Sequence, residues 1–226
     1  MNLLILGRGK TGSMVAEIAF SRRHHVRVLS SAENAGASAL TPDALATTDA
    51  VIDFTTPAAV VANAEACIRA KKNIVVGTTG WYEQVPRLRE MVLSAKTGFL
   101  YGSNFSIGVN LFFEIVATAG AALKYDYSGQ IFERHHAQKK DAPSGTAITL
   151  QKIVRETGGQ EVEIVSFREG DAVGMHEVVF NSAGDRIYLC HDAKSRLGFA
   201  EGAVRAAEWL AGKTGFYEFR SVWREL

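Results

Sequence analysis

The chain has 226 residues, 47% of them hydrophobic, and its 25 Lys and Arg residues nearly balance 24 Asp and Glu residues, giving a net charge of +1. This length allows one large domain or two smaller ones with a packed core. The balanced charge excludes the strongly basic surface that nucleic acid or an anionic membrane attracts, so we expect neither as a partner.

The cysteines and the start of the chain indicate a compartment. Cys67 and Cys190 form no CxxC motif and no metal-ligand cluster, so we expect reduced, buried thiols and no metal. No apolar run approaches the ~20 residues needed to span a bilayer. The residues after Met1 enter a strand directly, without a basic region or a cleavage site. These features predict a cytoplasmic protein.

The first residues carry the pattern of a nucleotide-binding unit. The apolar run at 3–6 predicts a buried parallel strand, and the motif Gly7-Arg8-Gly9-Lys10-Thr11-Gly12 follows at once, before a helical apolar spacing. Glycines at G-x-G-x-x-G spacing allow a tight turn, approach of a pyrophosphate to the backbone, and close helix–strand packing. The segment therefore predicts dinucleotide binding.

The end of the second strand bears on the choice of cofactor. This strand is expected at 26–29 and is followed by Ser30-Ser31-Ala32, where an NAD site usually has an acidic residue for the ribose hydroxyls. Glu33 comes slightly late. With no carboxylate to repel a 2′-phosphate, Arg8 and Lys10 could attract one, or they could be solvated loop cations. The pattern slightly favours NADPH and leaves NADH open.

Further buried strands are expected at 50–54, 73–76 and 99–101, separated by helices at about 58–71 and 83–95. This alternation predicts a parallel, Rossmann-type sheet. Small polar residues follow these strands at 55–56, 77–80 and 102–106. Because ligands bind at the carboxyl ends of parallel strands, these loops should line one crevice; the alternative for any one of them is simple turn chemistry.

The pattern changes after Ser106. A helix at 107–123 is apolar on nearly all sides and should be buried. Strands are expected at 127–133, 162–167, 177–181 and 186–190, with one helix at 144–156 among them. Their short connections predict a mixed, largely antiparallel sheet with helices on one face.

A last helix at 197–210 and the residues 215–223 should lead back to the first domain. We therefore expect a dinucleotide-binding domain at 1–106 and 205–226. A smaller α+β domain for substrate binding and oligomerisation should occupy 107–204. The fold class is α/β.

The chemically active side chains are concentrated at 133–147. His135 and His136 can exchange protons near neutral pH, and Lys139 is a fixed cation. Ser144 is a natural N-cap, so the N–H groups of the helix after it form a site for a carboxylate or phosphate. The tract predicts a pocket that binds an anion and protonates it. Alternatively the histidines are surface or strand residues, and in a strand their rings point to opposite faces.

The whole tract resembles the signature of the 4-hydroxy-tetrahydrodipicolinate reductase (dihydrodipicolinate reductase) family. That signature is Glu-x-His-His-x-x-Lys-x-Asp-Ala-Pro-Ser-Gly-Thr-Ala, and every fixed position is present from Glu133 to Ala147. Asp53-Phe54-Thr55, Gly77-Thr78-Thr79-Gly80, Asn104-Phe105-Ser106 and the stretch from Ser195 are also similar to family motifs, in the same order.

The resemblance implies an NAD(P)H-dependent oxidoreductase that converts 4-hydroxy-tetrahydrodipicolinate to tetrahydrodipicolinate in lysine and diaminopimelate biosynthesis. It implies that His135 is the proton donor and that His136 contacts the substrate. Lys139 would be the cationic partner of His135, holding substrate charge or itself protonating the ring. It also implies a small-molecule dicarboxylate as substrate and a homotetramer formed through the sheet of the second domain.

The resemblance implies binding residues as well. The substrate carboxylates would lie at Ser144, Gly145, Thr146 and Arg196, although Arg196 could equally be a surface residue beside a helix. The cofactor would contact Gly7, Arg8, Gly9, Lys10, Thr11, Gly12, Ser31, Phe54, Gly77, Thr78, Thr79, Gly102, Ser103, Asn104 and Phe105.

The sequence departs from the family pattern in three places. Its glycine loop is one residue shorter, the acidic residue that closes the second strand is absent, and a loop and strand of longer members are missing after Gly170. His176 fits a family Asp-x-x-Gly-x-His pattern and is expected to be structural. Two other functions stay open: another dinucleotide-dependent dehydrogenase, of amino acids or semialdehydes, and a non-catalytic NADPH sensor, against which the intact His135 and Lys139 tract argues.

Overall fold

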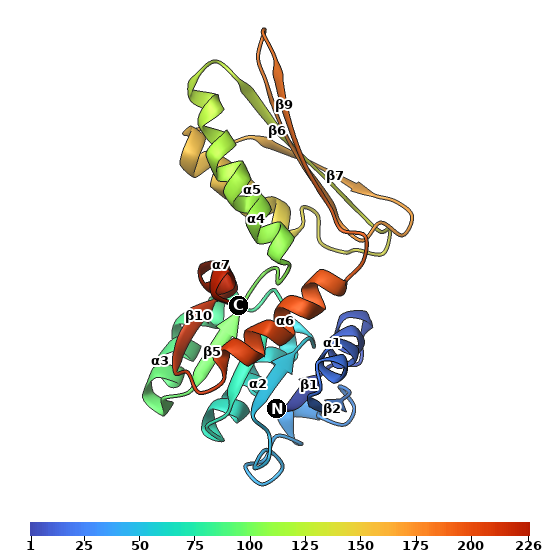
Figure 1. Cartoon of the computed structure of the whole chain (residues 1–226), viewed down its shortest axis with the longest axis vertical. Coiled ribbons are helices and arrows are strands. Elements are labelled where there is room, and N and C mark those ends of the chain that lie inside the picture. The colour runs from blue at the N-terminus through green and yellow to red at the C-terminus, as the bar shows by residue number, and fades with distance from the viewer. The chain divides into compact units, whose positions relative to one another are not determined.

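The computed structural model describes residues Met1–Leu226, which divide into two units with separate sheets (Figure 1). Unit 1 contains Met1–Ser106 and Leu197–Leu226, and unit 2 contains Ile107–Arg196. The sequence suggested that the chain returns to the first domain at residue 205, but it returns to unit 1 at Leu197. The reason is that the whole last long helix packs in unit 1 through small buried residues such as Ala203 and Ala207.

Unit 1 is built on six parallel strands in the order β10-β5-β4-β3-β1-β2. They are β1 (Asn2–Leu6), β2 (His25–Leu29), β3 (Ala50–Asp53), β4 (Asn73–Val76), β5 (Gly98–Tyr101) and β10 (Gly215–Glu218). The apolar runs of β1, β3 and β4 are almost fully buried because helices cover both faces of the sheet. The Rossmann-type fold expected from the sequence is confirmed.

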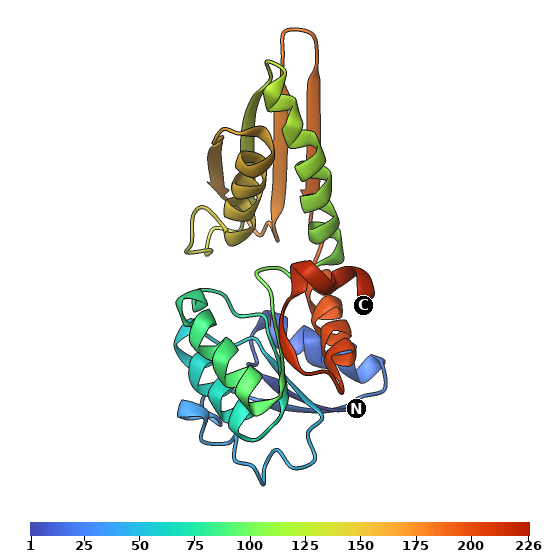
Figure 2. The same ribbon diagram turned by 90° about the vertical axis from the view of Figure 1, so that its left-hand side faces the viewer.

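The helices of unit 1 form a layer on each face of its sheet. Helices α1 (Lys10–Ser21) and α6 (Leu197–Leu210) cover one face, and α2 (Pro57–Arg69) and α3 (Val85–Ala95) cover the other (Figure 2). Short helical segments complete the unit: η1 (Ala35–Ala37), η2 (Tyr82–Gln84), α7 (Phe219–Val222) and η4 (Trp223–Glu225). Each large apolar side chain buried between these layers stabilises the fold by about 1.5–3 kcal/mol relative to exposure.

The strand order of unit 1 reverses at β1, which lies between β2 and β3. In an open parallel sheet such a switch point leaves a ligand crevice outside the carboxyl ends of the strands. The glycine loop follows β1 at the carboxyl ends of the strands. Because all strands are parallel, the loops that follow β2, β3, β4 and β5 leave at the same edge.

Unit 2 has four strands in the order β7-β6-β8-β9. They are β6 (Ser128–His135), β7 (Glu163–Arg168), β8 (Met175–Asn181) and β9 (Arg186–Asp192); β6 and β7 pair parallel, and the other pairs are antiparallel. Helices α4 (Ile107–Ala119) and α5 (Gly145–Gly158), with η3 (Gly120–Lys124), lie along one face, as the orientation of α4 and α5 in Figure 1 shows. The mixed, largely antiparallel sheet is therefore confirmed.

The segment Ile107–Lys124 is long and apolar enough to cross a membrane by length and composition alone, which the sequence-based search for apolar runs did not register. In the structure Phe112, Phe113 and Val116 of this segment are buried in the core of unit 2 against α5 and the sheet. That packing accounts for one side of the helix only. Ile107, Leu111 and Ile115 are exposed, so the expectation that the whole helix is buried is wrong for that side.

Two further expectations need correction. Strand β6 continues to His135, two residues beyond the predicted end, because Arg134 pairs with both β7 and β8 and His135 pairs with β7. Cys67 is buried as expected, whereas Cys190 is exposed. Successive residues of a strand point to opposite faces, and Cys190 of β9 points to the face that no helix covers.

Candidate active site

The glycine loop between β1 and α1 requires glycine at two of its three motif positions. Gly7 has a φ of +105°, and a Cβ there would lie 2.4 Å from the carbonyl oxygen of Phe54. A Cβ on Gly12 would lie 2.1 Å from the carbonyl oxygen of Gly7. Gly9, in contrast, has no atom within 4 Å of a Cβ, so its backbone is open beside the first N–H groups of α1. The loop therefore fits a pyrophosphate despite its short length.

A carboxylate does lie at the end of β2, which corrects the expectation that none does. Glu33 folds back, and its Oε2 accepts hydrogen bonds from the hydroxyl (2.6 Å) and the backbone N–H (2.8 Å) of Ser30. These two bonds lower the pKa of Glu33, so its side chain is ionised at neutral pH. Arg8 Nη2 lies 3.6 Å from Glu33 Oε1. One anion and one cation thus lie at the end of β2, the position that contacts the adenosine ribose in dinucleotide-binding folds of this type in general.

Asp53 connects three of the loops that follow the carboxyl ends of the strands of unit 1. Its buried carboxylate accepts hydrogen bonds from Thr55 N (2.8 Å), Asn63 Nδ2 (2.8 Å) and Thr78 Oγ1 (3.3 Å). Asn63 also accepts a hydrogen bond from Asn34, in the segment after β2 (2.9 Å). Burial raises the pKa of Asp53, although its hydrogen-bond donors oppose the rise. The network fixes the segments after β2, β3 and β4 relative to one another.

The other cofactor residues predicted from the sequence occupy the same edge. The ring of Phe54 covers Gly77, where a Cβ would lie 2.3 Å from it, and meets Phe105 edge to face at 6.2 Å. A Cβ on Gly102 would lie 2.8 Å from Phe219. The polar members differ in burial: Ser31 and Thr79 are exposed, Thr11 and Ser103 are half-buried, and Thr78 and Asn104 are buried. Glycines and rings therefore shape loops that present a few small polar groups.

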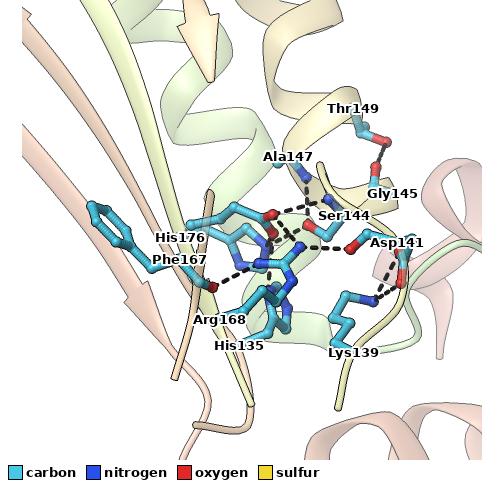
Figure 3. Close-up of polar contacts among 11 residues, drawn as sticks. His135, Lys139, Asp141, Ser144, Gly145, Ala147, Thr149, Phe167, Arg168 and His176 are labelled. Atoms are coloured by element: carbon cyan, nitrogen blue, oxygen red, sulfur yellow. Dashed lines mark hydrogen bonds and ion pairs between the residues drawn. The ribbon is translucent and has the colours of Figure 1, made fainter. Parts of the chain in front are cut away.

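In unit 2, polar side chains surround the carboxylate of Glu133 on β6, which has no exposed surface. Its Oε1 accepts hydrogen bonds from Arg168 Nη2 (2.6 Å) and Ser144 N (3.1 Å). Its Oε2 lies 3.0 Å from His135 Nδ1 and 3.9 Å from His176 Nε2. Burial alone would raise the pKa of Glu133, but these neighbours outweigh it and hold the pKa well below its ordinary value. Figure 3 shows the side chains of Ser144, Arg168, His135 and His176 pointing toward one another.

His135 ends β6 and points to the same face as Glu133, because the two are separated by two positions in a strand. Its ring meets that of His176 edge to face at 5.2 Å. Burial, aided by the charge of His135, lowers the pKa of His176 to about 3. His176 is therefore neutral at neutral pH, and its Nε2 lies 3.1 Å from Ser144 Oγ. Two buried imidazoles thus lie side by side.

Glu133, His135 and His176 offer ligand-type atoms within 4.8 Å of one another, a spacing that could hold a metal ion. The sequence had suggested no metal site. The guanidinium of Arg168 is bonded to the same carboxylate and supplies the positive charge that a bound cation would supply. We therefore interpret the cluster as an acid–base site.

Lys139 lies beside Asp141, with Nζ 2.7 and 2.9 Å from the two carboxylate oxygens. Arg168 links this pair to Glu133, because the same Nη2 also donates to the carbonyl oxygen of Asp141 (2.6 Å). Burial would raise the pKa of Asp141, but the Lys139 ammonium outweighs it and lowers the pKa. The charge of Lys139 also reaches His176, whose pKa it helps to lower. An ammonium and an imidazole therefore belong to one network (Figure 3).

Helix α5 begins in the same network. Its N-cap Ser144 is buried, and its Oγ accepts a hydrogen bond from Ala147 N (3.2 Å). Gly145 is exposed, with no atom within 4 Å of a Cβ, and Thr146 is buried. The first N–H groups of a helix have no intrahelical partner and favour anions. Open backbone at Gly145 is suited to a substrate carboxylate.

Comparison with known proteins adds an independent finding. The family model described as "Dihydrodipicolinate reductase, N-terminus" matches residues 1–105, and that described as "Dihydrodipicolinate reductase, C-terminus" matches residues 108–223. The 4-hydroxy-tetrahydrodipicolinate reductase of Christiangramia forsetii is 37% identical over 242 aligned residues, which cover 100% of this chain and 99% of the relative. The chain belongs to this family.

Other members of the reductase family agree with this assignment. The 4-hydroxy-tetrahydrodipicolinate reductase of Zymomonas mobilis is 40% identical over 195 residues, which cover 77% of this chain and 76% of the relative. A dipicolinate-bound dihydrodipicolinate reductase from Paenisporosarcina sp. TG-14 has a TM-score of 0.76 over 98% of this chain and 99% of that chain, at 24% identity, and shows the likeness in fold. The resemblance found in the sequence is confirmed, and the chain is an oxidoreductase whose Rossmann-type unit fits a nicotinamide cofactor.

The structure brings together most, not all, of the residues predicted for the reductase substrate site. His135, Lys139 and Ser144 belong to one network, and Gly145 and Thr146 open α5 beside it. His136 is half-buried and directly follows β6. Arg196 lies in the bend before α6 and has no hydrogen bond or ion pair with the Glu133 network, so its assignment stays a prediction.

Several residues of the network had no role in the sequence-based prediction. Glu133 was part of the motif, and the two-residue period of a strand would have placed it beside His135. Arg168 reaches the site through the parallel pairing of β6 with β7, in which it is the partner of His135. No local sequence pattern predicts the pairing of β6 with β7. His176, expected to be structural, contacts Ser144 and the acid–base cluster.

Proposed function

We propose that this chain reduces 4-hydroxy-tetrahydrodipicolinate to tetrahydrodipicolinate, with loss of water, in lysine and diaminopimelate biosynthesis. The observation that carries the proposal is the network of unit 2, in which an imidazole, an ammonium and the open N-terminus of α5 occur together. A diacid needs an anion site, and reduction of a conjugated imine needs a proton donor. The network provides groups suited to both tasks.

His135 is the proton donor in this proposal. Loss of water from the hydroxyl-bearing carbon of the substrate first creates a conjugated C=C–C=N system. When hydride adds to this system, an enamine-like anion forms and must be protonated. A positioned acid typically contributes ~10²–10⁴-fold to such a step. Lys139 stabilises the negative charge of the substrate and exchanges its contact with Asp141 for one with the substrate. The first N–H groups of α5, at Gly145 and Thr146, hold one carboxylate.

Unit 1 holds the cofactor, which supplies the hydride from its reduced nicotinamide. The backbone of Gly9 and the N-terminus of α1 bind the pyrophosphate, and the loops after β4 and β5 line the nicotinamide half. Cofactor choice depends on Arg8 and Glu33 at the end of β2. Arg8 and Lys10 attract a 2′-phosphate, whereas Glu33 repels it and suits a ribose diol, so we propose that both cofactors are accepted, NADPH with a slight advantage.

The assembly and the compartment are also proposals. The sheet face of unit 2 that α4 and α5 leave uncovered carries exposed Phe167 (41%) and Tyr188 (55%), which supports self-association into the tetramer that the family resemblance implies. Size-exclusion chromatography with light scattering tests it, and a monomer at micromolar concentration would contradict it. The free thiols Cys67 and Cys190 support a cytoplasmic location.

The decisive assay couples purified protein to enzymatically generated 4-hydroxy-tetrahydrodipicolinate and follows oxidation of NADPH and NADH side by side. The same assay with a panel of other imines and aldehydes tests for an amino-acid or semialdehyde dehydrogenase. We expect turnover only with the cyclic dicarboxylate. Tight NADPH binding with no turnover of any substrate would instead indicate a sensor.

A further inference from the structure

We infer that Glu133 is a positioning residue that keeps a proton on Nδ1 of His135 and so makes Nε2 the atom that transfers a proton to the substrate. Gly174, in the loop between β7 and β8, keeps that nitrogen uncovered. The inference rests on the proposed function, because it assigns an atom to the proton transfer that this function requires.

The Nδ1 side of the His135 ring is enclosed. Nδ1 lies 3.0 Å from Oε2 of Glu133 and has no exposed surface. The two atoms are close enough for a hydrogen bond but not aligned for one, and such contacts often tighten when a ligand binds. A buried carboxylate beside one ring nitrogen favours the proton on that nitrogen.

Glu133 is held as an anion in one orientation. Arg168 Nη2 and Ser144 N occupy its other oxygen, Oε1, at 2.6 and 3.1 Å, so Oε2 is directed at the histidines. His176 is the second ring near Oε2, at 3.9 Å, and it is neutral. His135 is therefore the nearer partner of this carboxylate. The other groups whose charge reaches His176 are Lys139 and His191, the partner of His176 on β9, whose own pKa is lowered by burial.

The Nε2 side differs. Nε2 of His135 makes no hydrogen bond within the chain, and the 9% exposure that the side chain retains is not at the enclosed Nδ1. The nearest approach comes from Gly174, where a Cβ would lie 3.0 Å from Nε2 and 3.3 Å from Cδ2. Real Cβ atoms rarely lie so close to a neighbour, so a methyl group there would cover Nε2 or displace the ring. Glycine at 174 is what leaves this nitrogen accessible.

The first test reads the tautomer directly and needs no substrate. Long-range ¹H–¹⁵N spectra of the full chain with ¹⁵N-labelled histidine report which ring nitrogen carries the proton, and the His135→Gln variant identifies the His135 signals. We expect the Nδ1–H form or the imidazolium in the wild type and a shift toward Nε2–H in Glu133→Gln. An unchanged His135 pattern in Glu133→Gln would overturn the inference.

The second test measures turnover. Glu133→Gln should lower kcat by between about 10-fold, as for loss of an outer partner of a ligating histidine, and about 10⁴-fold, as for the aspartate of a catalytic triad. Dissociation constants for NADPH and NADH should not change, because Glu133 lies in unit 2. Unchanged kcat would contradict a positioning role. If the wild type turned over no 4-hydroxy-tetrahydrodipicolinate, the proposed function would fail while the spectra still decided the inference.

Gly174→Ala serves where Glu133→Gln does not fold, since it removes no side chain from the Glu133 network. We expect a loss of kcat of at least about 10-fold, with the wild-type protonation at Nδ1. Gly184→Ala is the matched control, because a Cβ there meets only Ser182 Oγ, at 3.9 Å, in the β8–β9 turn. Equal turnover of the two alanine variants would overturn the role of Gly174.

Discussion

The candidate cofactor site of unit 1 and the Glu133 network of unit 2 are formed by different chemical groups, backbone in the first and charged side chains in the second. In unit 1 the site is mostly backbone. Gly7 and Gly12 lie where a Cβ would clash with neighbouring backbone atoms, and Gly9 leaves the backbone before α1 uncovered. In unit 2 the site consists of charged side chains gathered around one buried carboxylate. A backbone site should be disrupted by adding atoms, and a site of buried charges by removing them.

The largest effect is expected from removing the charged groups of unit 2. His135→Ala and Lys139→Ala should each lower kcat by about 10²–10⁴-fold, because each removes a group that acts on the substrate during protonation. Binding of NADPH, measured by fluorescence titration, should stay within about twofold of the wild type. The neighbouring, exposed Lys140→Ala is the control. A variant of His135 or Lys139 with near-wild-type kcat would remove that residue from the mechanism.

The same contrast explains how far the sequence could predict each site. The strand, glycine loop and helix of unit 1 follow one another in the chain, so the need for glycine in the loop can be recognised from the local sequence. In unit 2 the N-cap Ser144 was also recognisable locally. Arg168 and His176 were not, because they reach Glu133 through pairing of β6 with β7 and β8. The hydrogen bonds of Glu33 with Ser30 likewise depend on the loop conformation, which the positions of these residues in the sequence do not reveal.

An added methyl group should weaken unit 1 selectively. Gly9→Ala keeps an allowed backbone, with φ −72°, and meets no atom of the chain, so the fold should be intact. The methyl would stand where a pyrophosphate approaches, and we expect NADPH and NADH to bind about 10- to 100-fold more weakly, about 1.4–2.7 kcal/mol. Wild-type affinity, measured by calorimetry, would place the pyrophosphate elsewhere.

Acid should destabilise the buried network through His176. Its pKa is about 3 in the folded chain and near 6.5 when unfolded, so below about pH 6.5 the unfolded chain takes up a proton that the folded chain does not. The stability due to neutral His176 is complete above pH 6.5 and falls by up to about 1.4 kcal/mol per pH unit as pH decreases toward 3. In urea unfolding at about pH 7, 6 and 5, His176→Asn should reduce this slope and the exposed His25→Asn should not. Parallel curves for wild type and His176→Asn would refute the assignment.

The smallest effect concerns cofactor choice in unit 1. Glu33→Ala removes the anion beside Arg8, so the ratio of KM for NADPH to KM for NADH should fall about two- to fivefold, the range of an exposed charge pair. Glu17→Ala, an exposed carboxylate on α1, is the matched control. If the ratio is unchanged, Glu33 has no part in recognising the ribose.

The central claim is that the chain transfers a hydride from a nicotinamide cofactor to 4-hydroxy-tetrahydrodipicolinate and completes the reduction with a proton. The most direct measurement is a single turnover with cofactor deuterated at C4 of the reduced nicotinamide, analysed by mass spectrometry. We expect tetrahydrodipicolinate, lighter than the substrate by one oxygen atom before labelling and carrying one carbon-bound deuterium from the cofactor. Unchanged substrate, or product without cofactor-derived deuterium, would contradict the account.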